Sequence, residues 1–287
     1  AGDILRDLIE SEFVFTTKLS SIFRQAEESL IIVNAHRINS GEYPYVNEKE
    51  KDFFFMERTD EQSIVALISE LATTRLSAYY DGIDPIKDIQ VLTPVRKGAL
   101  GTASLNAELQ KMLNPPDPLK TEKKLGDRLF REGDKVMQTR NNYQIGWKKR
   151  RDFSEGQGVF NGDIGYIHSI DNDAGQMTVI FDEDRFVSYE FGQLDEIELA
   201  YAMTVHKSQG SEFPIVVMPV SWFPPMLATR NLLYTAVTRG KKVVILCGMQ
   251  RRMEAMVDNN RIKLRFSGLK HRLRALIGRS IIGSNEE

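Results

Sequence analysis

Two short apolar runs constrain the fold of this chain more than any other feature. They are Pro214–Val220 (PIVVMPV) and Lys242–Cys247 (KVVILC). A half-exposed strand alternates polar and apolar residues, whereas a strand buried on both faces of a parallel sheet reads as a continuous apolar run. A helix that ends at Gly240 is predicted between them, with an apolar side made of Leu232, Leu233, Ala236 and Val237. The chain is therefore predicted to be an α/β protein with a parallel sheet and helices on both faces.

Earlier segments show the same alternation of strand and helix. The sequence predicts a strand at Phe13–Leu19, a helix through Ile31, Ala35 and Ile38 that stops at Gly41, and a strand at Asp88–Thr93. Thr59 and Gln62 form a capping-box pattern that opens another helix, with an apolar stripe of Ile64, Leu67, Ile68 and Leu71. A further helix is expected at Thr102–Leu113, with Leu105, Leu109 and Met112 on its buried face and Pro115 and Pro116 closing it.

From about Phe130 the pattern changes to short strands separated by Gly and Asp turns. These predicted strands are Asp134–Gln138, Asp163–Ser169, Gln176–Phe181 and Phe186–Phe191. The stretch Gln144–Gln157 between them is too rich in charge to be core. The simplest architecture is a sheet domain interrupted by a small all-β barrel. We expect the first part of the sheet domain at residues 1–127, the insert at 128–195 and the second part, with a basic tail, at 196–287.

Composition excludes several classes of protein. The 287 residues are 41% hydrophobic with a formal net charge of −2, which is typical of a globular chain. No run of 18 apolar residues and no basic-then-apolar leader is present, so we expect no membrane span and a cytoplasmic location. A single cysteine, Cys247, and four scattered histidines give no disulfide and no metal-ligand spacing. No metal site is predicted.

Charge is distributed unevenly along the chain. Residues 1–87 carry 9 basic and 16 acidic residues, whereas residues 241–287 carry 11 basic and 4 acidic residues. A basic end fits a surface that faces a polyanion, but it fits a solvated helix face equally well. Both interpretations stay open for the tail, whose basic residues include Arg261, Lys263, Arg265, Lys270, Arg272 and Arg274.

Three patches place basic or polar side chains just past a predicted strand or in the helix after it, where ligands bind in open α/β sheets. They are Phe23–Gln25, Thr204–Phe213 and Leu233–Arg239. The sequence contains no G-x-x-x-x-G-K-[ST] phosphate loop and no G-x-G-x-x-G dinucleotide motif.

The runs TVHKSQGSEF and LLYTAVTRGKK, preceded by IFRQAEESLIIVNAH and LTPVRKG, resemble the motifs of the second RecA-like domain of superfamily 1 helicases. The resemblance is closest to the RecD/TraA type and covers nearly the whole chain. The block from Asp134 through Gly165 resembles the SH3-like barrel inserted in that domain. The phosphate loop and the acidic Mg²⁺ motif of the first motor domain are missing, so the chain looks like a C-terminal piece of a longer enzyme.

The resemblance implies roles for particular residues. Arg239 would be an arginine finger and Arg24 a second γ-phosphate contact, because a guanidinium stays charged and binds phosphate oxygens bidentately. A surface ion pair is the structural alternative for both residues. Gln209, Gly210 and Glu212 would contact the nucleotide or link it to DNA, or would form only a connecting loop. Thr204 and His206 would contact single-stranded DNA, although a lone histidine is more often buried and hydrogen-bonded. Arg96 and Lys97 are assigned to the cleft or the DNA side.

A second group of DNA-binding candidates lies in the insert. Trp147, Lys148 and Lys149 combine an aromatic ring with basic side chains, which suits base stacking and phosphate contact. An ordinary surface loop explains them equally well.

The resemblance implies the C-terminal motor domain of an ATP-dependent DNA helicase that translocates in the 5′–3′ direction. The expected partners are single-stranded DNA and the N-terminal motor domain of the same protein, and the expected cofactor is ATP with Mg²⁺, bound mainly by that N-terminal domain. This chain alone is expected to lack ATPase activity. The alternative is a non-catalytic nucleic-acid-binding or protein-interaction module with a helicase-like fold.

Overall fold

The structure is a computed structural model that describes residues 4–17, 29–48, 51–182, 184–261 and 268–282. Its contacts divide the chain into two units, one of Glu28–Asn260 and one formed by the residues on either side. In the smaller unit, α1 (Ile4–Ser11) packs against α8 (Leu269–Ile282), and Lys270 Nζ lies 2.6 Å from Glu10 Oε2.

The strand predicted at Phe13–Leu19 is wrong for its described part. Residues 13–17 follow α1 without regular structure and pair with no described strand, while residues 18–19 lie outside the described chain. A strand requires a hydrogen-bonding partner, and the Phe15 side chain is instead fully exposed.

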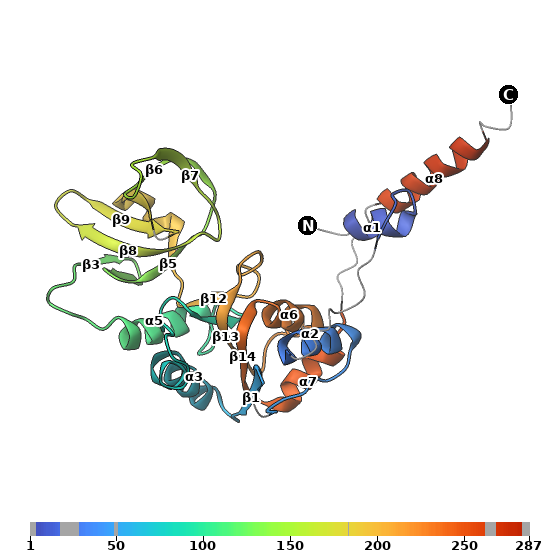
Figure 1. Ribbon diagram of the computed structural model, residues 1–287, viewed down its shortest axis with the longest axis horizontal. Helices are drawn as coiled ribbons and strands as arrows, with labels where there is room; N and C mark the ends of the chain where they lie inside the picture. Colours follow the sequence, from blue (N-terminus) through green and yellow to red (C-terminus); the bar gives the residue numbers. More distant parts are fainter. Residues whose placement is uncertain (1–3, 18–28, 49–50, 183, 262–267, 283–287) are drawn as a thin grey trace. The chain divides into compact units, whose positions relative to one another are not determined.

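The larger unit is built on a sheet of five parallel strands in the order β1-β14-β13-β2-β12. The two apolar runs of the sequence form β13 and β14, two of its three inner strands, and their apolar side chains are buried on both faces. The strands are β1 (Phe53–Glu57), β2 (Ile89–Thr93), β12 (Ala202–Thr204), β13 (Phe213–Val220) and β14 (Gly240–Gly248). The predicted parallel sheet is confirmed (Figure 1).

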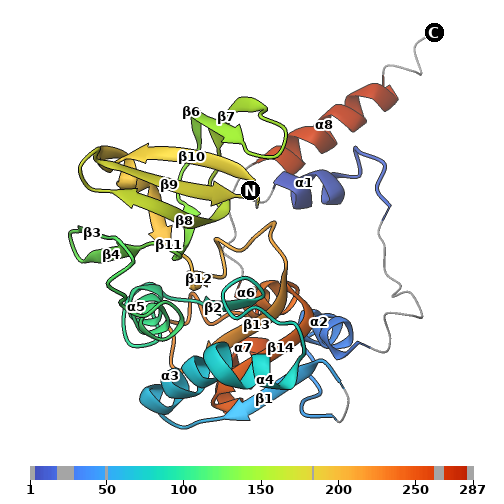
Figure 2. The same cartoon turned by 60° about the vertical axis from the view of Figure 1, so that its left-hand side comes forward.

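Helices cover both faces of this sheet, as predicted (Figures 1 and 2). One face packs against α2 (Leu30–Ser40), α6 (Arg230–Val237) and α7 (Gln250–Asp258). The other packs against α3 (Glu61–Glu70), the π-helix η2 (Leu71–Arg75), α4 (Leu76–Tyr79) and α5 (Thr102–Leu113).

Two details of the predicted helices are wrong. Helix α3 is capped by Asp60 rather than Thr59, because the Asp60 carboxylate accepts hydrogen bonds from Ser63 N and Ser63 Oγ at 2.8 and 2.7 Å. Both hydrogen bonds lower the pKa of Asp60, and the one from the Ser63 backbone amide has the larger effect. In α5, Met112 is 51% exposed, whereas Asn106 and Gln110 are buried. The insert packs on this side of α5 and supplies hydrogen-bond partners for both amides.

The insert is an antiparallel sheet in the order β11-β5-β8-β9-β10-β6-β7 around a core of its own. In the described chain its end strands, β11 and β7, do not pair with each other, so hydrogen bonds do not close a barrel. The stretch Gln144–Gln157 lies mostly in the β6–β7 hairpin. The elements are the β3–β4 hairpin (Glu122–Leu125, Arg128–Arg131), β5 (Lys135–Gln138), β6 (Asn142–Lys149), β7 (Glu155–Val159), β8 (Ile164–Asp171), β9 (Gln176–Phe181), β10 (Arg185–Glu190), the 3₁₀-helix η3 (Phe191–Glu196) and β11 (Ile197–Leu199). The domain limits 1–127, 128–195 and 196–287 stay predictions.

Two buried ionisable residues join the insert to the parallel sheet. The Asp134 carboxylate accepts hydrogen bonds from Arg131 N, Gln110 Nε2, Asn114 Nδ2 and Tyr201 OH at 2.6–2.9 Å. Burial raises the pKa of Asp134, and these hydrogen bonds oppose the rise. The neighbouring Lys135 is 1% exposed, and its Nζ donates to Ile89 O at 3.3 Å. The insert is thus anchored at the start of β2 and on α5.

Candidate nucleotide and nucleic-acid sites

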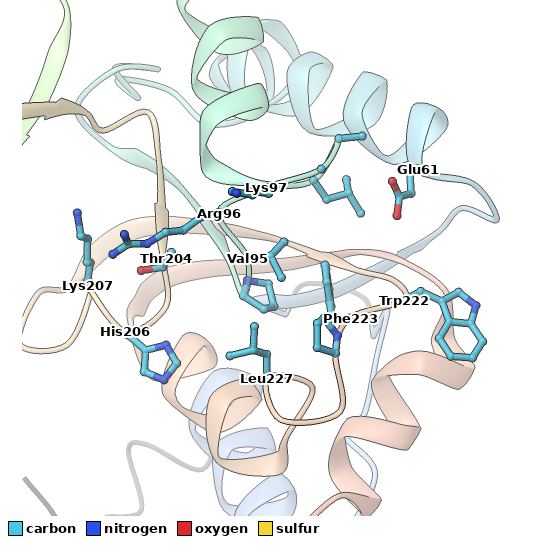
Figure 3. A pocket seen from close by; sticks show the side chains of 15 residues that line it. Glu61, Val95, Arg96, Lys97, Thr204, His206, Lys207, Trp222, Phe223 and Leu227 are labelled. Carbon is cyan, nitrogen blue, oxygen red and sulfur yellow. The ribbon is translucent and has the colours of Figure 1, made fainter. Parts of the chain in front are cut away.

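The carboxyl ends of β2 and β12 lie side by side, because Thr93 is the parallel partner of Thr204. The segments that follow the two strands therefore begin at the same edge of the sheet. They line a pocket of about 730 Å³, together with the segment after β13 and the first residue of α3. The lining residues are Glu61, Pro94, Val95, Arg96, Lys97, Gly98, Ala99, Leu100, Thr204, His206, Lys207, Trp222, Phe223, Pro224 and Leu227 (Figure 3).

Four of the predicted DNA-binding residues line this pocket: Arg96, Lys97, Thr204 and His206. Arg96, Lys97 and His206 are exposed, whereas Thr204 is buried at the end of β12. Figure 3 shows Arg96, Thr204 and His206 toward one side of the pocket, with Lys207 beside them. The structure thus brings the cations Arg96 and Lys97 together with the Thr204 hydroxyl from a distant part of the sequence, a combination suited to phosphate contact.

A tight loop holds Arg96 in place. Thr93 Oγ1 donates to Leu100 O at 2.6 Å, and the first amide of α5, Thr102 N, donates to Val95 O at 3.1 Å. A Cβ on Gly101 would lie 2.6 Å from backbone atoms of Arg96, so no larger residue fits without moving this loop. The helix start and the cationic segment are therefore packed as one piece.

The connection from β12 to β13 runs from the carboxyl edge of the sheet to its amino edge. It is a series of turns over residues 205–210 rather than a helix, and the Ser208 hydroxyl donates to Val205 O at 2.8 Å. Gly210 has φ +91°, and a Cβ there would meet nothing within 4 Å, so backbone conformation rather than crowding favours glycine. Gln209 lines a small hollow beside Thr235 of α6. The turns thus join the pocket to the opposite edge of the sheet.

Arg239 and Glu212 lie at that amino edge. Arg239 follows α6 and precedes β14, and its carbonyl accepts from the first amide of β13, Phe213 N, at 2.8 Å. Arg239 therefore lies at the edge of the sheet opposite to the carboxyl ends where Arg96 and Thr204 are found. The reason is that α6 carries the chain back across the sheet before the arginine is reached.

The Arg239 guanidinium is held by neutral oxygen atoms. Its Nε donates to Thr235 O at 3.2 Å, Nη1 to Ser211 O at 3.0 Å and Nη2 to Thr238 Oγ1 at 3.2 Å. Ion pairs within the described chain do not include Arg239, while Glu212 pairs with Lys241 at 2.8 Å. The hydrogen bond from Lys241 lowers the pKa of Glu212. A guanidinium has five N–H groups, so two remain for an anionic ligand.

The remaining predicted site residues lie elsewhere. Arg24 is outside the described residues. Trp147, Lys148 and Lys149 are on β6 in the insert, where Trp147 and Lys148 line a separate hollow of about 540 Å³. Lys148 pairs with Glu155 at 2.7 Å, and the Trp147 ring covers Gly156, where a Cβ would lie 2.4 Å from the ring. The structure does not bring these three residues into the pocket of Arg96 and Thr204.

Sequence reasoning missed two pocket residues. Lys207 lines the pocket and pairs with Glu198 at 2.8 Å, although it stands inside the recognised run TVHKSQGSEF. Trp222 follows the apolar run of β13 by two residues. The signal for both was their position just beyond the carboxyl end of a buried strand, where ligands bind in open sheets.

Two further findings concern the described residues alone. They contain no cluster of three or more His, Cys, Asp or Glu side chains that could hold a metal ion. None of their helices is long and apolar enough to span a bilayer.

Two family models match the chain. Residues 105–181 match the ATP-dependent RecD-like DNA helicase SH3 domain, and residues 199–247 match the UvrD-like helicase C-terminal domain. Together with the parallel sheet flanked by helices, these matches show that the chain is similar to the C-terminal region of superfamily 1 helicases.

Curated relatives define the type within that class. The ATP-dependent RecD2 DNA helicase of Deinococcus radiodurans is 31% identical over 261 residues, which are 91% of this chain and 32% of the relative. The RecBCD enzyme subunit RecD of Mycolicibacterium smegmatis is 28% identical over 68% of this chain and 31% of the relative. The predicted resemblance to the C-terminal region of RecD-type helicases is confirmed, and the chain spans about a third of the length of these relatives.

A solved structure is also similar to the chain. It is the Pif1 helicase from Bacteroides in complex with ADP-AlF3 and ssDNA, which is 18% identical with a TM-score of 0.46. The match covers 94% of this chain and 57% of that chain.

Proposed function

We propose that this chain is the C-terminal motor domain of an ATP-dependent 5′–3′ DNA helicase. The observation that supports it best is the convergence of Arg96, Lys97, Thr204 and His206 from separate strand ends on one pocket. Cations and a hydroxyl beside apolar side chains suit a flexible, negatively charged strand. The RecD-like and UvrD-like family matches favour DNA as that strand.

Nucleotide contact is proposed for the opposite edge of the sheet. Arg239 fits a triphosphate because neutral oxygens orient its guanidinium, no described carboxylate pairs with it and two N–H groups remain. Arg24 is proposed as the second phosphate contact, and Gln209, Gly210 and Glu212 as the nucleotide side of the connecting turns. ATP with Mg²⁺ would supply the hydrolysable phosphoanhydride, held mainly by an N-terminal motor domain.

Coupling between the two sites follows from the chain path. The turns of residues 205–210 begin at Thr204 in the pocket, and Ser211 at their far end accepts a hydrogen bond from Arg239. A displacement of Arg239 toward a phosphate would therefore pull directly on the segment that carries His206. The insert also meets these turns, since a Cβ on Gly162 would lie 4.0 Å from Lys207 O. We propose that Trp147, Lys148 and Lys149 of the insert extend the grip on DNA.

The proposal is tested by adding an N-terminal motor domain to this chain. This chain is fused to the phosphate-loop motor domain of a RecD-type helicase, and DNA-stimulated ATP hydrolysis is measured with and without Arg239→Ala. An arginine finger contributes about 10³ to 10⁵ in rate, so a loss of at least about 10³ in kcat is expected. The isolated chain is expected to hydrolyse no ATP.

The control is Arg75→Ala, which removes an exposed arginine of η2 outside both sites. It is expected to leave kcat unchanged. If Arg239→Ala leaves hydrolysis at the wild-type rate, the motor interpretation fails, and the non-catalytic module becomes the better account. Robust hydrolysis by the isolated chain would contradict the proposed division of labour.

A further inference from the structure

Trp222 is an exposed tryptophan at the rim of the pocket. It follows β13 by two residues, lines the pocket and is 68% exposed (Figure 3). The adjacent Phe223 is buried in the core, so the segment is fixed at its next residue. A large aromatic ring that is exposed beside a pocket indicates a ligand contact, because burial of the ring against a ligand would be favourable.

The indole ring has one covered face and one open face. Arg252 of α7 lies against it, with Cζ 3.2 Å from the ring centroid. The Arg252 Nε is buried without a hydrogen-bond partner, and ion pairs within the described chain do not include Arg252. The guanidinium therefore serves to hold the ring. Because most of Trp222 is exposed, the face away from Arg252 is open.

The support beneath Trp222 is rigid. Met249 N donates to Val220 O at 3.0 Å, which ties the end of β13 to the end of β14. At Gly248, where φ is +148°, a Cβ would lie 1.8 Å from that same carbonyl oxygen, so the two strand ends are in direct backbone contact. A ring fixed in this way loses little conformational freedom when a ligand stacks on it.

The rest of the pocket complements a nucleotide strand. Its cations, Arg96, Lys97 and Lys207, lie away from Trp222, with apolar side chains such as Val95 and Leu227 between them (Figure 3). Among the described lining residues Glu61 alone is acidic, and it lies on the Trp222 side, where a base rather than a phosphate would sit. The charge pattern thus orients a bound strand with its backbone at the cations.

We propose that Trp222 is a stacking platform for one nucleobase of single-stranded DNA, held in position by Arg252. This inference rests on the proposed DNA-binding function and adds a base contact to a site otherwise built for phosphates. Every base has a π-face, so the contact would increase affinity without selecting a sequence.

The test measures binding of this chain to two fluorescent probes by anisotropy. One probe is a dT oligonucleotide, and the other is an abasic oligonucleotide of the same length, which keeps the phosphates and lacks the bases. Trp222→Ala is expected to weaken dT binding about 5- to 100-fold and to leave abasic binding unchanged. Trp222→Phe keeps a ring and is expected to retain most of the dT affinity.

Two controls accompany these variants. Tyr79→Ala removes a 78% exposed ring that does not line the pocket, and it should leave both affinities unchanged. Lys97→Ala should weaken binding of both probes and reduce the slope of log K against log salt by about 0.7, the value for one phosphate contact on a single strand. Far-ultraviolet circular dichroism checks that each variant is folded.

The outcomes distinguish failure of the stacking proposal from failure of the proposed DNA-binding function. If Trp222→Ala binds dT like the wild type while Lys97→Ala weakens binding, the platform is refuted and the DNA site stands. If Trp222→Ala weakens dT and abasic binding equally, no base contact is made and the platform is again refuted. If the wild-type chain binds neither probe, the proposed DNA-binding function itself fails.

Discussion

Lys135 provides a quantitative test of how the insert is joined to the sheet. Its side chain is 1% exposed, and its Nζ donates a hydrogen bond to a neutral oxygen atom, Ile89 O. Burial lowers the pKa of Lys135 from 10.5 to about 7, and the charges of Asp84 and Asp88 only partly oppose this change. The folded chain therefore holds a largely neutral amine above pH 7, whereas the unfolded chain holds an ammonium ion up to about pH 10.

The sign of the pH dependence follows from proton binding. Between pH 7 and 10.5 the unfolded state binds more protons at Lys135 than the folded state does, so the free energy of unfolding rises with pH. At 1.36 kcal/mol for each unit of pKa difference, folding carries a penalty of roughly 4 kcal/mol at pH 7. About 2 kcal/mol of that penalty is relieved between pH 7 and pH 9.

The perturbation is Lys135→Met, which keeps the aliphatic stem and removes the amine. Urea denaturation followed by circular dichroism gives the free energy of unfolding of wild type and variant at pH 7, 8 and 9. The variant should gain least from the rise in pH, so the difference between the two proteins should change by about 2 kcal/mol across this range. Other titrating groups are common to both proteins and cancel in the difference.

The matched control is Lys111→Met, at a lysine whose side chain is 71% exposed on α5. Its difference from the wild type should be the same at all three pH values, since folding buries little of this side chain. A difference for Lys135→Met that is equally flat would refute the argument, because it would mean that the buried amine keeps its proton on folding.

Two other substitutions test the packing around the site. Asp134→Asn turns a carboxylate that accepts four hydrogen bonds into an amide whose NH₂ group faces hydrogen-bond donors. It should lower the free energy of unfolding by about 2–5 kcal/mol. The control Asp195→Asn removes one partner of an exposed ion pair and should lower the free energy of unfolding by less than about 1 kcal/mol. Equal melting temperatures for the two variants would contradict the role of Asp134. Gly248→Ala forces a Cβ against Val220 O and should cost about 1–3 kcal/mol, whereas Gly192→Ala, where a Cβ meets nothing within 4 Å, should melt near the wild-type temperature.

Local sequence pattern predicted the elements that depend on neighbours in the chain. The apolar runs of β13 and β14 predicted that both strands are buried on both faces of the sheet. Helix α5 begins and ends at the predicted residues Thr102 and Leu113. Strand β9 also has its predicted limits, Gln176–Phe181. Such features follow from side-chain periodicity and from the conformations open to Gly and Pro, which are properties of short segments.

The arrangement of the site depends on the order of strands in space. Thr204 meets Arg96 because β12 pairs with β2, and Arg239 reaches the opposite edge because α6 crosses the sheet. Met112 is exposed and Gln110 buried because the insert, from a later part of the chain, packs on α5. The sequence alone determined the sheet class, the insert and the residue types available for chemistry. Only tertiary structure decided which of them share a pocket, since strand pairing and helix packing join residues with no local relation in sequence.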